Sequence, residues 1–252
     1  MTSASRKNTL LSRRELAALL PAAHLLPAVP ERRRATSCGI PFIRIVHGDS
    51  RLRLLRIHGD EETARQAVEL LVETLEAEAW IVDSNTRTVE FSGLRLDPNR
   101  MFSREGAARN LRRLNPSASP DAIDAALDRL DSCRPALLAA ASPPSGGLWI
   151  AAHNNGPGYS METEVPISRK IHRPQPEMPR DFFLFTDEKD FLIAARGPYN
   201  ALLQDRPGGE DDGSLSRWCA ARAVRYVNVE TAHGRLDKQL EMLRWLVRSL
   251  PL

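Results

Sequence analysis

Residues 52–61 read Leu-Arg-Leu-Leu-Arg-Ile-His-Gly-Asp-Glu, and the fold class can be predicted from this stretch and the residues that follow it. Its first six residues are rich in leucine and isoleucine and suit a buried strand. Residues 62–77 follow with apolar side chains at helical spacing, so we expect a helix there. The turn between them is polar and contains His58 and Glu61. A strand that leads through a short turn into a helix is the building unit of an α/β sheet.

The same alternation continues to the end of the chain. Short apolar segments predict strands, and longer segments with apolar residues three or four apart predict helices. The expected strands are residues 79–82, 87–91 (an edge strand), 148–152, 182–185, 191–194 and 224–229, and the expected helices are residues 104–114, 120–141 and 236–250. This order predicts one α/β domain with a mostly parallel sheet and helices on both faces.

The positive charge of the chain is concentrated at its amino terminus. The 252 residues include 35 Lys+Arg and 32 Asp+Glu, which gives a net charge of +3. Residues 1–34 hold seven basic and two acidic residues (+5), so residues 35–252 hold 28 basic and 30 acidic residues (−2). A nucleic-acid-binding protein concentrates positive charge on its folded face, where it neutralises phosphates. The charge distribution therefore argues against nucleic acid as a partner.

Residues 1–36 are predicted to be a leader, and residues 37–252 the catalytic domain. The pair Arg13-Arg14 precedes an uncharged run over residues 16–29, which resembles a twin-arginine export signal. That run is shorter than the roughly 20 residues of a membrane-spanning helix, so we expect no transmembrane anchor. Ala35-Thr36-Ser37 is a weak candidate for a cleavage site. Export would place the protein in the periplasm; the alternative is a basic arm on a cytoplasmic protein.

The three cysteines are Cys38, Cys133 and Cys219, and they lie far apart without a C-x-x-C spacing. They therefore predict neither a cysteine zinc site nor a disulfide framework. One disulfide is compatible with this count, but we expect buried thiols.

Polar residues follow the predicted strands at the edge where α/β sheets bind ligands. His58 and Glu61 are three residues apart in one turn, so they can hold a metal ion from the same side, and His153 follows a later strand. Two imidazoles and one carboxylate leave one position of a tetrahedral zinc open, as in catalytic zinc sites. Considered alone, His153 is better explained as a hydrogen-bonded loop histidine.

Two further segments change that balance. Asp97-Pro98-Asn99-Arg100 places a guanidinium beside an amide, which suits the binding of a substrate carboxylate. Glu230 follows the apolar segment 224–229, where it could move protons between water and a leaving amine.

Four ordered motifs resemble a known family. His-Gly-Asp-Glu at 58–61, Asp-Pro-Asn-Arg at 97–100, Ala-His-Asn-Asn at 152–155 and Val-Asn-Val-Glu at 227–230 are similar to those of zinc carboxypeptidases and of the aspartoacylase/succinylglutamate desuccinylase group. The resemblance spans residues 57–230 and implies a carboxypeptidase-like mixed sheet flanked by helices. It also implies one zinc ion per chain, with His58, Glu61 and His153 as ligands.

The resemblance also assigns roles to further residues. Asn99 and Arg100 would bind the substrate carboxylate, Glu230 would be the general base and acid, and Asp97 would orient His58. An arginine upstream of that pair would polarise the scissile carbonyl, for which Arg87 is the candidate and Arg95 the alternative. The tyrosine that covers the substrate would be Tyr199 or Tyr159.

These residues and the resemblance predict a zinc-dependent hydrolase that cleaves an amide bond next to a free carboxylate. We expect a metallocarboxypeptidase (a protease) acting on small peptides, and the alternative enzyme is an N-acyl amino acid deacylase. Ala151 stands where the deacylases have an aspartate. A third alternative is a non-catalytic relative that binds a metal or ligand. The presence of Glu230 argues against it, because a binding module needs no general base.

Overall fold

A computed structural model describes residues 29–252. The Arg13-Arg14 pair and residues 16–28 of the uncharged run lie outside these described residues. Within the described range, no helix combines the length and apolar character needed to cross a membrane.

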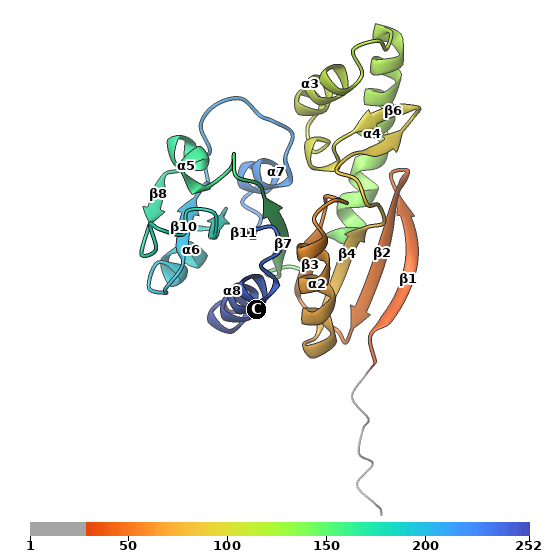
Figure 1. Cartoon of the computed structure of the whole chain (residues 1–252). Helices are drawn as coiled ribbons and strands as arrows, with labels where there is room; N and C mark the ends of the chain where they lie inside the picture. Colours follow the sequence, from red (N-terminus) through yellow and green to blue (C-terminus); the bar gives the residue numbers. More distant parts are fainter. Residues whose placement is uncertain (1–28) are drawn as a thin grey trace, which may run out of the picture.

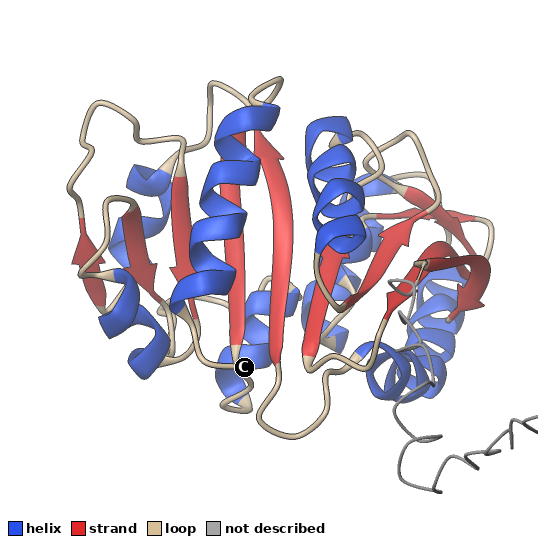
Figure 2. Ribbon diagram, turned by 90° about the horizontal axis from the view of Figure 1, so that it is seen from below, coloured by secondary structure: helices blue, strands red, loops and turns tan. Residues whose placement is uncertain are grey.

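The fold is organised around one nine-stranded mixed sheet (Figures 1 and 2). Its strand order is β1-β2-β4-β3-β7-β11-β9-β10-β8, and the four central strands β4, β3, β7 and β11 run parallel. The bounds are β1 (Glu31–Ser37), β2 (Ile40–His47), β3 (Leu52–Arg56), β4 (Ala77–Val82), β7 (Leu148–Asn155), β8 (Lys170–His172), β9 (Phe182–Phe185), β10 (Asn200–Leu203) and β11 (Tyr226–Ala232).

Helices cover both faces of this sheet, as the sequence predicts (Figure 2). One face packs against α2 (Glu62–Thr74), α6 (Glu188–Ala194) and α8 (Leu236–Ser249). The other face packs against α3 (Arg104–Leu114), α4 (Pro120–Ala141) and α7 (Leu215–Ala221). Short elements complete the chain: β5 (Val89–Phe91), β6 (Leu94–Leu96), α5 (Met161–Glu164), and the 3-10 turns η1 (Pro98–Arg100) and η2 (Val165–Ile167). The predicted fold class, a single α/β domain with a mixed sheet between two helical layers, is confirmed.

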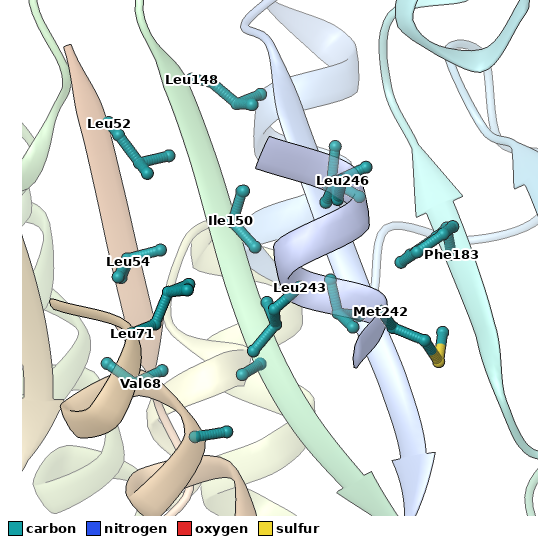
Figure 3. Close-up of a cluster of buried hydrophobic side chains, with 14 of the residues drawn as sticks. Leu52, Leu54, Val68, Leu71, Leu148, Ile150, Phe183, Met242, Leu243 and Leu246 are labelled. Carbon is teal, nitrogen blue, oxygen red and sulfur yellow. The ribbon is translucent and has the colours of Figure 1, made fainter. Parts of the chain in front are cut away.

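The core follows from the period-two alternation of the strands. Leu52 and Leu54 of β3, and Leu148 and Ile150 of β7, point to the α2/α8 face, where they meet apolar residues of both helices (Figure 3). Leu55 of β3 points to the opposite face and packs in the cluster with α3, α4 and α7. Both faces of the central strands are therefore buried, which explains their nearly continuous apolar sequences.

One predicted strand is wrong and another lies outside the main sheet. Residues 191–194 belong to α6, whose N-cap Asp187 accepts hydrogen bonds from the Lys189 and Asp190 main-chain N–H groups. That capping signal outweighs the short apolar run. Residues 87–91 do not form an edge of the main sheet, because β5 pairs only with β6 in a separate hairpin.

The predicted boundary of the leader at residue 36 needs correction. Residues 31–37 form β1, which pairs with β2 along its whole length. Arg32 and Arg34 form ion pairs with Glu69 and Asp83 of the domain. Cleavage after Ser37 would remove β1 from the sheet, so the folded part of the chain extends back at least to residue 31.

A disulfide joins Cys38, in the turn between β1 and β2, to Cys133 on α4. The Cα atoms are 5.0 Å apart, within the range of native disulfides. The expectation of buried thiols is therefore met only by Cys219, which is free and fully buried.

Candidate active site and metal centre

Three neighbouring strands bring the predicted site residues to one edge of the sheet. β3, β7 and β11 lie side by side and run parallel, so their carboxyl ends meet (Figure 1). His153 of β7 and Glu230 of β11 are direct register partners. His58 and Glu61 follow the end of β3 in the turn to α2. The carboxyl ends of parallel strands are the edge where open α/β sheets bind ligands.

The side chains of adjacent residues at the end of β7 point to opposite faces of the sheet, because side chains alternate along a strand. Ala151 packs in the apolar cluster with α3, α4 and α7, and His153 lies on that same face two residues later. Asn154 points to the α2/α8 face, where it bonds to both helices. Asn155 returns to the first face and contacts Glu230.

His58, Glu61 and His153 form a cluster of metal-binding groups whose ligand atoms lie within 4.8 Å of one another. The Nδ1 atom of His58 lies 2.7 Å from Glu61 Oε1, and the Nδ1 atom of His153 lies 3.1 Å from Glu61 Oε2. All three residues are only 2–3% exposed. Two imidazole nitrogens and one carboxylate suit zinc and leave a tetrahedral position open.

The electrostatics of this cluster fit a bound cation. Within residues 29–252, Glu61 Oε2 and the buried Nε2 atom of His153 make no hydrogen bond of normal geometry, although Glu61 Oε2 lies 3.1 Å from His153 Nδ1. Buried polar atoms without a regular hydrogen bond are rare. Burial opposes protonation of His58, yet the carboxylates of Glu61 and Asp97 raise its pKa to about 9. Burial also opposes ionisation of Glu61, but the two histidines hold its pKa well below the ordinary value. The cluster thus attracts positive charge, which a divalent cation supplies.

Asp97 lies behind His58, at the position that the sequence predicts. Its Oδ1 atom is 3.1 Å from His58 Nε2 and also accepts a hydrogen bond from the Asn99 main-chain N–H. Burial disfavours the charged form of Asp97, but the bond to His58 and the nearby Arg87 keep its pKa well below normal. A carboxylate on the outer ring nitrogen fixes the orientation of a metal-binding imidazole.

A buried arginine supports the turn that carries His58 and Glu61. Arg56 is 1% exposed, and its guanidinium donates to main-chain carbonyls that include those of Gly59 and Glu61. Gly59 runs so close to the next loop that a Cβ atom there would lie 2.3 Å from the Thr86 carbonyl oxygen. The close approach of two main-chain segments, rather than flexibility, requires a glycine at this turn.

A hydrogen-bond network on the opposite face ties the two ligand-bearing segments together. Asn154 accepts a bond from the Ala64 main-chain N–H in the first turn of α2, and it donates to the side chain of Gln239 on α8. Gln239, which is fully buried, donates in turn to the His153 carbonyl. The network fixes β7 relative to α2, and therefore His153 relative to Glu61.

Glu230 is 6% exposed and is held by two amides. Asn155 donates to its Oε2 atom at 3.0 Å and Asn228 to its Oε1 atom at 3.1 Å. Arg180 donates to the Asn155 side-chain oxygen and so fixes that amide. Burial raises the pKa of Glu230, and the His153 charge and both amides only partly oppose it. A carboxyl group with a raised pKa is suited to proton transfer near neutral pH.

Asn99 and Arg100 lie together at the mouth of the same cavity. The Asn99 side-chain oxygen accepts from the Leu215 main-chain N–H, which leaves its NH2 group available as a donor. Arg100 is half-buried, with its Nη2 atom 3.5 Å from the Asp212 carboxylate. Both residues belong to the 3-10 turn η1, which is capped by Asp97, and both line the cavity.

Of the two candidate arginines, Arg87 lines the cavity and Arg95 does not. Arg87 lines the cavity, with its Nε atom 3.2 Å from Asp97 Oδ2 and its Nη1 atom 3.8 Å from Glu61 Oε1. Arg95 is exposed on β6, where its main chain pairs with Asn115, and it does not line the cavity.

The structure does not bring Tyr199 to the cavity. Its ring is 4% exposed and packs between Phe183 and Trp245, and its hydroxyl donates to Glu241. Tyr159, the alternative, lines the cavity. The placement of Tyr199 follows from its position at the start of β10, on the face that α8 covers.

The cavity has a volume of about 350 Å³ and contains every other predicted site residue except Asp97, which lies directly behind it. Asn155 and Asn228 lie within the sequence motifs, which assign them no role, and further wall residues that include Glu164, Gln204 and Arg217 are not predicted by any motif. The alternation of β11 is a signal for Asn228, because a residue two before Glu230 must share its face. Glu164 on α5, Gln204 just past β10 and Arg217 on α7 have no strand alternation that relates them to a motif.

The fold and cavity define an α/β protein with a candidate metal site at the carboxyl edge of a mixed sheet. Neither a family model nor a curated protein sequence matches the chain. Among solved structures it is similar to the murein-tripeptide amidase MpaA from Escherichia coli O157, with 18% identity over 92% of this chain and 97% of that one and a TM-score of 0.47. It is also similar to the product-bound ectoine utilization protein EutE (DoeB) from Ruegeria pomeroyi. The identity is 14%, the match covers 88% of this chain and 71% of that one, and the TM-score is 0.44.

Both TM-scores lie below 0.5, so these similarities carry no argument about function, and a functional proposal rests on the side chains of the cavity.

Proposed function

We propose that this protein is a zinc-dependent hydrolase that cleaves an amide bond next to a free carboxylate, and that it acts as a metallocarboxypeptidase on small peptides. One observation carries the proposal. A single cavity holds the His58, Glu61 and His153 cluster, the buried Glu230 and the Asn99–Arg100 pair. These are the three kinds of group that such a reaction needs: a metal site, a proton carrier and an anion-binding pair.

Each residue contributes a distinct action. When bound, zinc supplies Lewis acidity, which polarises a carbonyl and acidifies water. Glu230, held by two amides, accepts a proton from the attacking water and returns it to the leaving amine. Arg100 and the Asn99 amide bind the substrate carboxylate and so position the scissile bond. Arg87, beside Glu61, stabilises negative charge that develops on the carbonyl oxygen.

Ala151 favours a peptidase over a deacylase. It is fully buried in the apolar cluster two residues before His153, so it provides no carboxylate at the place where the deacylases have one. A substrate screen separates the two enzymes. The zinc-loaded protein should hydrolyse peptides with free carboxyl termini and leave N-acyl amino acids intact, whereas the opposite preference would establish a deacylase. Metal analysis should find one zinc per chain, and full activity in zinc-free protein would refute the proposed site.

The disulfide supports export of the protein to an oxidising compartment. Disulfides persist in secreted and periplasmic proteins and are rare in the cytosol, and Cys38–Cys133 bridges two elements of the folded domain. Thiol titration of the denatured protein, taken from its native host, should find only the Cys219 thiol. Three thiols per chain would place the protein in the cytoplasm.

A further inference from the structure

Glu164 stands apart from the other acidic side chains of the cavity. It ends α5 and lines the wall together with Gln204 and Tyr159. The Tyr159 hydroxyl donates to its Oε1 atom at 2.8 Å, and Gln204 Nε2 donates to its Oε2 atom at 2.8 Å. Both partners are neutral, so neither compensates the negative charge of the carboxylate.

Every other carboxylate that lines the cavity has a basic partner or a proposed role in the reaction. Glu61 lies between two histidines, and Asp212 lies within 3.6 Å of Arg100 and Arg217. Glu230 is the proposed proton carrier. Within residues 29–252, Glu164 has no basic side chain within ion-pair distance, so its charge is available to a cationic group that enters the cavity.

The carboxylate of Glu164 is also held in a fixed position. Gln204, at the end of β10, is 3% exposed, and its amide nitrogen donates both to Glu164 and to the Ser168 hydroxyl. The Ser168 hydroxyl itself donates to the Glu164 main-chain carbonyl. A carboxylate braced by a buried amide loses little conformational entropy when it binds a cation, which favours recognition.

We infer that Glu164 determines specificity, and that the cavity takes substrates in which the residue with the free carboxylate has a cationic side chain, an amine or a guanidinium. This inference rests on the proposed function. Arg100 and Glu164 would bind opposite charges of the same residue, its carboxylate and its side chain. An aliphatic chain of the same length without the charge would leave Glu164 desolvated and uncompensated.

The test compares N-acylated dipeptides that end in lysine, arginine, norleucine or glutamate. The zinc-loaded wild type should cleave the lysine and arginine peptides with a kcat/KM about 10- to 100-fold above that of the norleucine peptide. Glu164→Gln keeps an acceptor for the Tyr159 hydroxyl but removes the charge, so the ratio of kcat/KM for the lysine peptide to that for the norleucine peptide should fall to about one. An equal loss on all four peptides would show that Glu164 only positions Tyr159, and would overturn the inference.

The chain offers a matched control on the same short helix. Glu162 is exposed, pairs with Arg173 at 2.9 Å and does not line the cavity. Glu162→Gln removes the same charge two residues away, so it should leave the lysine preference unchanged. Loss of the preference in this variant would mean that the general charge of α5, rather than Glu164, attracts the substrate.

A binding measurement separates this inference from the proposed function. Titration calorimetry with free lysine and norleucine should show tighter binding of lysine, and Glu164→Gln should abolish the difference. Lysine binding without hydrolysis of any peptide would refute the peptidase but keep the specificity of Glu164. Peptide hydrolysis without any preference for lysine over norleucine would refute the specificity of Glu164 but keep the peptidase.

Discussion

The cavity has two walls built in different ways. The ligand wall consists of residues that are at most 6% exposed; its members are His58, Glu61, His153 and Glu230, and Asp97 supports it from behind. The substrate wall consists of partly exposed residues on the turns, loops and short helices that connect the strands, and its members are Asn99, Arg100, Tyr159, Glu164 and Arg217.

The difference separates the chemistry of the site from its specificity. The end of a strand is fixed by its neighbours in the sheet, so groups placed there keep their distances to within the tolerance that proton transfer and metal binding need. Loops tolerate substitution and insertion, so residues placed there can change what is bound without disturbing the reaction. The predictions that follow disturb one wall at a time.

The largest effect is expected from Glu230→Gln on the ligand wall. The substitution keeps the shape of the side chain but removes its ability to accept a proton, so kcat should fall by about 10²- to 10⁴-fold. Zinc content should remain one per chain, because Glu230 is outside the ligand cluster. Glu210→Gln, a change at an exposed residue of the loop before α7, serves as the control and should not alter kcat. Retained turnover in Glu230→Gln would point to another base.

A change on the substrate wall should spare the chemistry. Arg100→Ala removes a charged hydrogen-bond donor, so kcat/KM for peptides with a free carboxyl terminus should fall by about 10- to 100-fold. Carboxyl-terminally amidated peptides should show little further loss. Arg95→Ala provides the matched control, since this arginine belongs to the next hairpin and lies outside the cavity. An equal loss on amidated peptides would contradict the carboxylate-binding role.

Asn154 and Asn155 support different members of the ligand wall, because these sequence neighbours lie on opposite faces of the sheet. Asn154 bonds to α2 and α8, and Asn155 bonds to Glu230. Asn154→Ala disconnects α2 from β7 and should weaken zinc binding by about tenfold, measured by competition with a chelator. Asn155→Ala removes a donor to Glu230 and should lower kcat by a similar factor with zinc affinity unchanged. Identical profiles for the two variants would show that the faces do not act separately.

The smallest effect lies away from both walls and concerns stability in acid. Burial opposes ionisation of Glu78, but the bond from Arg44, the Arg53 charge and the Trp80 indole hold its pKa below the ordinary value. Its charge therefore stabilises the fold above the unfolded-state pKa, and this stabilisation is lost as the pH falls through the lower folded-state pKa. Glu78→Gln should cost about 1 kcal/mol at pH 7 and less at pH 3, as measured by urea unfolding. A difference that is constant with pH would contradict this assignment.

The same division between walls explains what the sequence could predict. The ligands and Glu230 follow strands with strong apolar patterns, so their meeting at one sheet edge follows from the order of the elements. The helices at residues 104–114 and 120–141 were also predictable, because Ser103 and Ser119 are capping residues ahead of periodic apolar segments.

Other features depend on contacts that no local pattern records. The sequence pattern does not predict β2 and β10, and it predicts a strand within α6, because apolar runs this short fit either structure. Tyr159 and Tyr199 both follow glycine and proline residues, so spacing could not separate them. The partners of Glu164 come from β10 and from the loop before α5, and only the folded chain brings them together.

The disulfide places some residues of the candidate site inside a covalent ring and leaves the others outside it. Cys38 and Cys133 close a covalent ring over a sequence separation of 95 residues, and this ring contains both ligands of the first turn and the carboxylate-binding pair. His153 and Glu230 belong to the open chain that follows. Even in the unfolded oxidised protein, the ring restricts how far its members can separate, whereas the other two residues are unconstrained. The complete candidate metal site can therefore assemble only when the open segment places β7 beside β3, and tight zinc binding would report that step during folding.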